Sequence, residues 1–121
     1  MVAIEAFLKV LRGKDKGKGW KLSPRQIYIL GRNRECNLLL HDGTVSGIHA
    51  RLQYQEGVWR VTDLKSRHGT YVNSRQKIIG SKPLFDRDLI RVGKPILEFR
   101  EYEQLDPPDL AQIDQGVWMP E

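Results

Sequence analysis

Two short polar segments contain most of the side chains in this sequence whose types could do chemistry together. The first runs Thr-Val-Ser-Gly-Ile-His-Ala over residues 44–50, and the second runs Ser-Arg-His-Gly-Thr-Tyr-Val-Asn over residues 66–73. Both combine hydroxyl and imidazole groups with a glycine at a turn. If the fold brings the two segments together, their side chains can converge on one charged ligand.

The sequence between these segments indicates how they are brought together. Ala50, Leu52 and Tyr54 alternate with polar residues, and Gly57 separates them from a second β-rich run over residues 58–62. This pattern is typical of two strands joined by a tight turn, which sends both flanking loops to the same end of a sheet. We therefore expect the two polar segments to meet.

The rest of residues 1–100 also reads as short strands. Turn residues separate β-forming runs, and no stretch has sustained helical spacing with caps. Besides the hairpin, we expect strands over residues 4–11, 20–22, 26–30, 70–72, 77–79, 89–92 and 96–99, with a further apolar run at 38–40. This arrangement predicts an all-β sandwich or barrel.

The length of 121 residues favours one compact domain, which we place at residues 1–101. From Tyr102 the composition changes, and Pro107 and Pro108 disfavour a strand. We interpret residues 102–121 as an acidic tail or linker, in which residues 110–113 could form a single helical turn. Trp118 is unusual for a solvated tail and could pack on the domain.

The charged residues also change close to this domain boundary. All 20 Lys and Arg lie in residues 1–100 with nine acidic residues, a formal charge of +11, whereas the last 21 residues have six acidic residues and no base. The single cysteine, Cys36, excludes an internal disulfide and a cysteine-based zinc cluster. No apolar run approaches the ~20 residues of a membrane span, and no signal peptide is evident. We expect a cytoplasmic protein without a membrane partner.

Several chemical functions are disfavoured. Ser46, His49 and Asp63 do not suggest a hydrolase, because residues 46 and 49 lie within one turn and no oxyanion site is evident. The spacing of Cys36 and the three histidines is too irregular for a metal site. The glycine- and lysine-rich loop over residues 12–19 superficially resembles a phosphate-binding loop, but its spacing is wrong and no Ser or Thr follows Lys18. We expect no catalysis, metal or cofactor.

A larger set of residues, in order and spacing, covers the chain from about residue 5 to 100. It comprises Gly31-Arg32, Leu39, Asp42, Val45-Ser46, His49-Ala50, Asp63, Ser66, Gly69-Thr70, Val72-Asn73, Leu84, Asp86, Asp88, Ile90 and Gly93. This ordered set resembles the forkhead-associated (FHA) domain family. The resemblance implies a sandwich of two twisted, mostly antiparallel sheets. It also implies that loops at one end bind a phosphothreonine peptide without catalysis.

The resemblance assigns roles to residues of the first segment. Arg32, after the turn-forming Gly31, would be the phosphate-binding arginine, and Ser46 would donate its hydroxyl to a phosphate oxygen. His49 would be a buried strut that hydrogen-bonds to loop backbone. These residue types suit phosphothreonine, which has close to two negative charges and three strong acceptor oxygens.

In the second segment, Ser66, Gly69 and Thr70 keep the family's Ser-x-Asn-Gly-Thr pattern, but His68 replaces the asparagine that grips the peptide backbone. Imidazole also offers one donor and one acceptor, with a different reach. Gly47 stands where many members have arginine, and Arg67 either restores that charge or is a solvated loop tip. We count Gly69, Thr70 and Asn73 among the predicted peptide-binding residues, and Ser66 with Gly31 and His49 among those that support the site.

Three functions remain open from the sequence. The first is a non-enzymatic module that binds phosphothreonine in a partner protein, such as a Ser/Thr kinase substrate. The alternative is a degenerate FHA fold that acts as a phospho-independent scaffold or oligomerisation module. The third is nucleic-acid binding by the basic body. We do not expect it, because the basic residues are dispersed and no stacking aromatics alternate with them.

Overall fold

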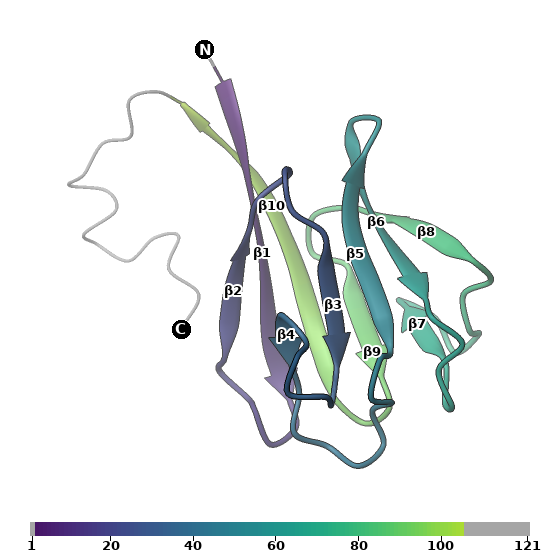
Figure 1. The fold of residues 1–121 in the computed structure, drawn as a ribbon. Coiled ribbons are helices and arrows are strands. Elements are labelled where there is room, and N and C mark those ends of the chain that lie inside the picture. The colour runs from purple at the N-terminus through teal and green to yellow at the C-terminus, as the bar shows by residue number, and fades with distance from the viewer. Residues whose placement is uncertain (1, 106–121) are drawn as a thin grey trace.

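The computed structural model describes residues 2–105, and within this range the chain forms ten strands and no helix. The strands are β1 (Val2–Arg12), β2 (Gly19–Leu22), β3 (Tyr28–Gly31), β4 (Leu38–Leu39), β5 (Ala50–Gln55), β6 (Val58–Asp63), β7 (Thr70–Val72), β8 (Ser81–Leu84), β9 (Leu89–Val92) and β10 (Ile96–Leu105). They build two five-stranded sheets, and the predicted all-β sandwich is confirmed (Figure 1).

The two sheets differ in how their strands are ordered. One has the order β2-β1-β10-β9-β7, and all its pairs are antiparallel. The other has the order β4-β3-β5-β6-β8, and its only parallel pair is β3 with the short β4. The predicted hairpin is the pair β5 and β6, whose register joins Ala50 to Asp63. This pair opens directly into the two polar segments.

The core lies between the sheets and holds the loops in place. Alternate strand residues point to opposite faces, so β1 buries Leu8 and β10 buries Leu97 and Phe99 against Leu52 and Val61 of the facing hairpin. All five have an exposed fraction of 0%. Full burial of such a side chain contributes about 1.5–3 kcal/mol. The loops therefore extend from a rigid scaffold.

Two expectations about the strands differ from the structure. The predicted strand over residues 77–79 is wrong, because Lys77 makes one isolated bridge to Tyr71 and the Ile79 side chain is 96% exposed. The strand in this region is β8, at the edge of its sheet. Pro83 made β8 hard to recognise from the sequence, because proline disfavours most strand positions. Proline is nevertheless tolerated in edge strands.

The last strand is longer than expected. β10 pairs with β1 from Ile96 to Leu105, beyond the predicted domain boundary at residue 101, and Val2 pairs with Leu105. The proposed tail features at residues 110–113 and at Trp118 lie outside the described residues. Within residues 2–105 no helix is long or apolar enough to cross a membrane.

Several loops gather at one end of the sandwich. Residues 13–18, 32–37, 40–49 and 93–95 all lie at the lower end of Figure 1, away from the β2–β3 and β5–β6 turns. Two of these loops contain predicted site residues.

Candidate functional site

The loop after β3 is locked to the loop before β5 through the backbone. The amide of Arg32 donates to the Ser46 carbonyl at 3.0 Å, and the amide of Asn33 donates to the Gly47 carbonyl at 3.1 Å. Gly31 permits this approach, because a Cβ atom there would collide with the Gly47 carbonyl. Glycine at position 31 is therefore required by a close backbone contact.

The Arg32 side chain is exposed but held at its base. Its Nε donates to the carbonyl of Val45 at 3.0 Å. Arginine has five N–H donors, and no partner for the terminal amino groups of Arg32 is present among residues 2–105. The guanidinium is thus oriented by one hydrogen bond while most of its donors face solvent.

Ser46 links the two polar segments directly. Its Oγ accepts a hydrogen bond of 2.9 Å from the backbone amide of Arg67, 21 residues further along the chain. Since the hydroxyl acts as an acceptor in this bond, its own proton is free to donate. The Arg67 side chain is exposed and has no ion pair or hydrogen bond in the described part of the chain.

The buried ring of His49 also connects the two polar segments. Its ring has an exposed fraction of 0%; Nδ1 accepts from the Ser46 amide at 3.0 Å, and Nε2 lies 2.9 Å from the Gly69 carbonyl. An acceptor at Nδ1 requires the proton on Nε2, which then donates to that carbonyl. Burial lowers the pKa of His49 and keeps the ring neutral. The ring bridges backbone groups and is not exposed for proton transfer.

The carboxylate of Asp63 organises the second segment. It accepts hydrogen bonds from the Ser66 amide at 3.1 Å, from the Ser66 hydroxyl at 2.6 Å and from the Thr70 hydroxyl at 2.7 Å. Ser66 Oγ in turn accepts from the Gly69 amide at 2.9 Å. Burial opposes ionisation of Asp63, but the hydrogen bonds from Ser66 and Thr70 outweigh it and lower the pKa. Ser66 and Thr70 are thus committed to holding the loop.

His68 sits at the outer edge of this loop. Its side chain is exposed, and its carbonyl accepts from the Tyr71 hydroxyl at 3.1 Å. Tyr71 is itself covered by the Arg91 guanidinium, 3.9 Å from the ring centroid. Gly69, with φ of 86°, adopts a backbone conformation that favours glycine and lies beneath the Lys77 side chain. The backbone that presents the His68 imidazole is therefore fixed.

Asn73 is not brought to the other predicted site residues by any contact. It follows the far end of β7, where its amide oxygen accepts from the Leu89 backbone at 2.8 Å and its amide nitrogen donates to Asp88 at 2.8 Å. These bonds tie the end of β7 to the start of β9. The contacts account for Asn73 as a structural residue.

Three residues that stabilise the loops of the site were not identified as such from the sequence. Asp63 entered only in the family pattern and in a rejected hydrolase set, although an Asp three residues before a Ser is a common signal for a side-chain-closed turn. Tyr71 had no local signal. Cys36, whose thiol lies 3.3 Å from the Gly47 carbonyl, has burial as the main cause of its raised pKa. It contributes packing beneath the first loop.

The described residues contain no group of three or more metal-ligating side chains. Around the two polar segments, the exposed arginines Arg32 and Arg67 and the Ser46 hydroxyl extend from rigid loops with neutral donors nearby. Such an arrangement can bind an anion with several acceptor oxygens.

Comparison with known proteins identifies the family. The family model of the FHA domain matches residues 28–93. The chain belongs to the FHA domain family. The matched range includes both polar segments and Arg32. This FHA domain therefore has its candidate site within the region that defines the family.

Relatives of this FHA domain are named for regulation. The chain is 37% identical over 95 residues to an oxoglutarate dehydrogenase inhibitor of Corynebacterium diphtheriae, covering 78% of this chain and 64% of that protein. It is 34% identical over 94 residues to the glycogen accumulation regulator GarA of Mycolicibacterium smegmatis, covering 78% and 58%. The chain thus spans somewhat less than two thirds of these relatives, neither of which is named as an enzyme.

A solved structure has the same architecture. It comes from a structural and functional analysis of phosphothreonine-dependent FHA domain interactions, has a TM-score of 0.69 and is 27% identical. The match covers 79% of this chain and 95% of that one.

Proposed function

We propose that this FHA domain binds phosphothreonine-containing segments of partner proteins and mediates phosphorylation-dependent protein–protein interaction without catalysis. The observation that carries the proposal is the lock between the two polar segments. Ser46 Oγ accepts the Arg67 amide while the Val45 carbonyl accepts Arg32 Nε. These bonds orient the Arg32 guanidinium and bring the backbone of Arg67 next to the Ser46 hydroxyl, whose proton is free to donate.

In the proposed complex, Arg32 supplies the main cation to the phosphate and Ser46 donates its hydroxyl to a phosphate oxygen. Arg67 adds a second cation, which compensates for Gly47. Phosphothreonine suits this set, because its three oxygens accept several charge-assisted hydrogen bonds at once. Both guanidinium groups are unpaired in the described residues and lose no internal ion pair on binding.

The remaining predicted residues have supporting or specificity roles. His68 would contact the peptide backbone beside the phosphothreonine with its exposed imidazole. Gly69 and Thr70 shape that loop through the Asp63 network, which Ser66 completes. His49 ties it to the first segment, and Gly31 supports that first segment through its close contact with Gly47. Asn73 would act indirectly, by fixing the end of β7.

The comparisons support a protein as the partner. The related solved structure belongs to work on phosphothreonine-dependent FHA domain interactions. The curated relatives are named as an inhibitor of an enzyme and as a regulator. We therefore propose that the ligand is a protein phosphorylated by a Ser/Thr kinase, with binding serving regulation.

The expected binding affinity can be estimated from the number of hydrogen bonds to the phosphate. Hydrogen bonds to charged groups are worth about 1.5–3 kcal/mol each, so three or four give roughly 6–10 kcal/mol before ordering costs. This corresponds to about micromolar affinity. Removal of Arg32 should cost roughly 2–4 kcal/mol, because the phosphate would be left partly unpaired.

The test is fluorescence anisotropy with degenerate peptide pools that contain phosphothreonine, phosphoserine or unmodified threonine. We expect saturable binding of the phosphothreonine pool, weakened more than tenfold by Arg32→Ala. Arg25→Ala is the matched control, since Arg25 is an exposed arginine in the turn between β2 and β3. Equal binding of all pools, or none, would instead favour the phospho-independent scaffold.

A further inference from the structure

A second group of cations lies on the loops beside the proposed phosphate site. Lys14 and Lys16 lie in the β1–β2 loop, and Lys94 lies in the β9–β10 turn. All three side chains are exposed. We call these three residues the lysine ridge.

The two loops that form the lysine ridge are packed together and on the β4–β5 loop. Gly13 lies against Pro95, since a Cβ atom at position 13 would be 3.4 Å from the proline ring. Asp15 accepts hydrogen bonds from the His41 amide at 2.7 Å and pairs with the His41 ring at 2.9 Å. The Lys94 amide donates to Thr44 Oγ1 at 2.8 Å. The backbone that carries the ridge is therefore fixed relative to residues 41–44.

The same short segment connects the ridge to the phosphate site. Thr44 holds Lys94 on one side, and the next two residues, Val45 and Ser46, hold Arg32 and Arg67. An extended chain spans at most about 3.3–3.6 Å per residue. The two residues from Thr44 to Ser46 thus cover at most about 7 Å. A peptide centred at Ser46 would reach Lys94, the ridge residue bound to Thr44, within a few residues.

The acids near the ridge are already engaged within the fold. Asp42 accepts hydrogen bonds from the Thr44 amide and hydroxyl, which lower its pKa, and the charges of Lys14 and Lys94 lower it further. Asp15 is bound to His41. The side chains of the three ridge lysines form no ion pair or hydrogen bond within residues 2–105. The charge of Asp42 partly offsets Lys14 and Lys94, but all three ammonium groups lack a direct partner and can still attract an external one.

We propose that the lysine ridge binds acidic residues that flank the phosphothreonine in the partner protein, so that this domain selects acidic phosphothreonine segments. The inference rests on the proposed function and adds a preference to it. Peptide carboxylates fit the ridge because its charges are separate exposed lysines on two adjacent turns, each able to meet one carboxylate. Nucleic acid fits less well, since no aromatic side chain stands among these lysines for base stacking.

The test compares three phosphothreonine peptide pools of equal length by fluorescence anisotropy. One has four Glu residues on the amino-terminal side of the phosphothreonine, one has them on the carboxyl-terminal side, and one has Gln at all these positions. We expect one Glu pool to bind about tenfold more tightly than the Gln pool at low salt. The difference should vanish in 1 M salt, where the Debye length is roughly 3 Å.

The variant Lys14→Glu/Lys94→Glu should remove that preference, with the Gln pool weakened no more than about twofold. Its control, Arg25→Glu/Lys82→Glu, places the same charge changes at exposed positions in the β2–β3 turn and on β8. Circular dichroism should give both variants the parent spectrum. Loss of the preference in the control as well would overturn the ridge and indicate a general charge effect.

The remaining outcomes separate the two proposals. Equal, phosphate-dependent binding of the Glu and Gln pools would overturn the ridge alone. Binding without phosphate dependence would overturn both. A random-sequence DNA duplex is the last probe. DNA binding that falls steeply with salt and is lost in Lys14→Glu/Lys94→Glu, with no Glu preference, would assign the ridge to nucleic acid instead.

Discussion

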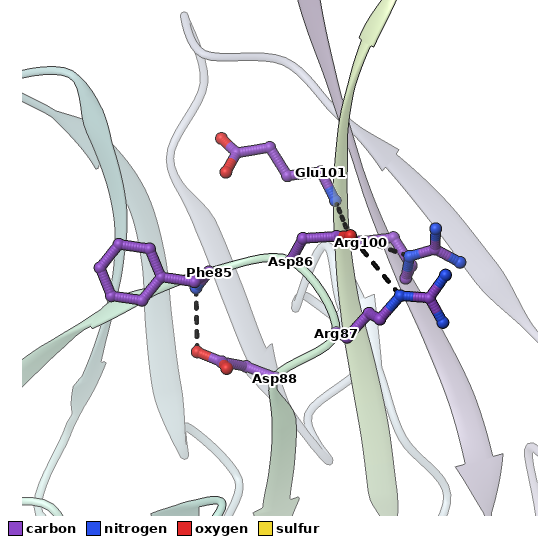
Figure 2. Close-up of polar contacts among 6 residues, drawn as sticks. All are labelled: Phe85, Asp86, Arg87, Asp88, Arg100 and Glu101. Carbon is purple, nitrogen blue, oxygen red and sulfur yellow. Dashed lines mark hydrogen bonds and ion pairs between the residues drawn. The ribbon is translucent and has the colours of Figure 1, made fainter.

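Two carboxylate-centred networks, near opposite ends of the sandwich, use similar residue types to different effect. In the loop after β6, Asp63 accepts only from neutral donors of Ser66 and Thr70. In the turn after β8, Asp86 instead accepts from the Arg100 guanidinium and the Glu101 amide, both at 2.8–2.9 Å, and lies 3.8 Å from Arg87 (Figure 2).

The two networks differ in whether the carboxylate binds arginine side chains. At Asp86 the acid neutralises nearby arginines, so its cations are already satisfied within the fold. At Asp63 the acid fixes backbone and hydroxyl groups, and the arginines of that end, Arg32 and Arg67, have no acidic partner in the described residues. Because Asp63 orders its loop without using a guanidinium group, the charges of Arg32 and Arg67 remain available.

The largest expected effect follows from removing Asp63. In Asp63→Ala, three donors lose their acceptor, and the Thr70 hydroxyl lies in a fully buried residue. We expect the free energy of unfolding to fall by about 2–4 kcal/mol and phosphopeptide affinity to fall with it. Urea denaturation measures the first and anisotropy the second. A loss below about 1 kcal/mol would mean that the loop is ordered by other contacts.

A second change tests whether the site can accept a further cation. A Cβ atom at Gly47 would come within 2.8 Å of the Asn33 side-chain oxygen, and position 47 does not have a positive φ. We expect Asn33→Ala/Gly47→Arg to raise affinity for a phosphothreonine peptide about three- to tenfold, because the new guanidinium reaches the phosphate. Asn33→Ala alone is the control. No gain over that control would argue against a phosphate beside Gly47.

The third prediction concerns pH. Burial lowers the pKa of His49 below its ordinary value of 6.5, so the unfolded chain binds a proton that the folded chain excludes. Stability should therefore be full above about pH 6.5 and fall as the pH decreases, by at most about 1.4 kcal/mol per unit. Urea denaturation at about pH 7.5 and about pH 5.5 brackets this range. His49→Gln should flatten the dependence, whereas Arg25→Ala, at an exposed arginine in the β2–β3 turn, should leave it unchanged.

The smallest effect is expected at the other network. Asp86→Ala removes partly exposed ion pairs, which contribute about 0–1 kcal/mol, together with the bond to the Glu101 amide. We expect a loss of about 1 kcal/mol in unfolding free energy and unchanged peptide affinity. A loss of affinity would show that the two ends of the sandwich are coupled.

The sequence predicted the central part of the fold well. The hairpin of β5 and β6 was visible because its alternation is regular and Gly57 marks its turn. β8 was missed because its exposed Ser81 and Lys82, followed by Pro83, carry no strand signal. Its strand conformation comes from pairing with β6, a contact between distant residues.

For the site, local sequence was a weaker guide. Arg32 and Ser46 could be singled out by resemblance, but their hydrogen bonds to Val45 and Arg67 depend on loops that only the complete sandwich brings together. Asn73 shows the converse. It shares a segment with binding candidates, yet its amide is used between β7 and β9. Residues that are close in sequence can therefore lie at opposite ends of a strand and make unrelated contacts.

The pairing of β1 with β10 has a consequence for attachment. Val2 and Leu105 are register partners at the end of the sandwich opposite the loops around Ser46 (Figure 1). Tethering through either strand would therefore leave the loops around Ser46 unobstructed. A flexible connection at that end would set the effective concentration of the domain near any tethered phosphoprotein without altering a single binding contact.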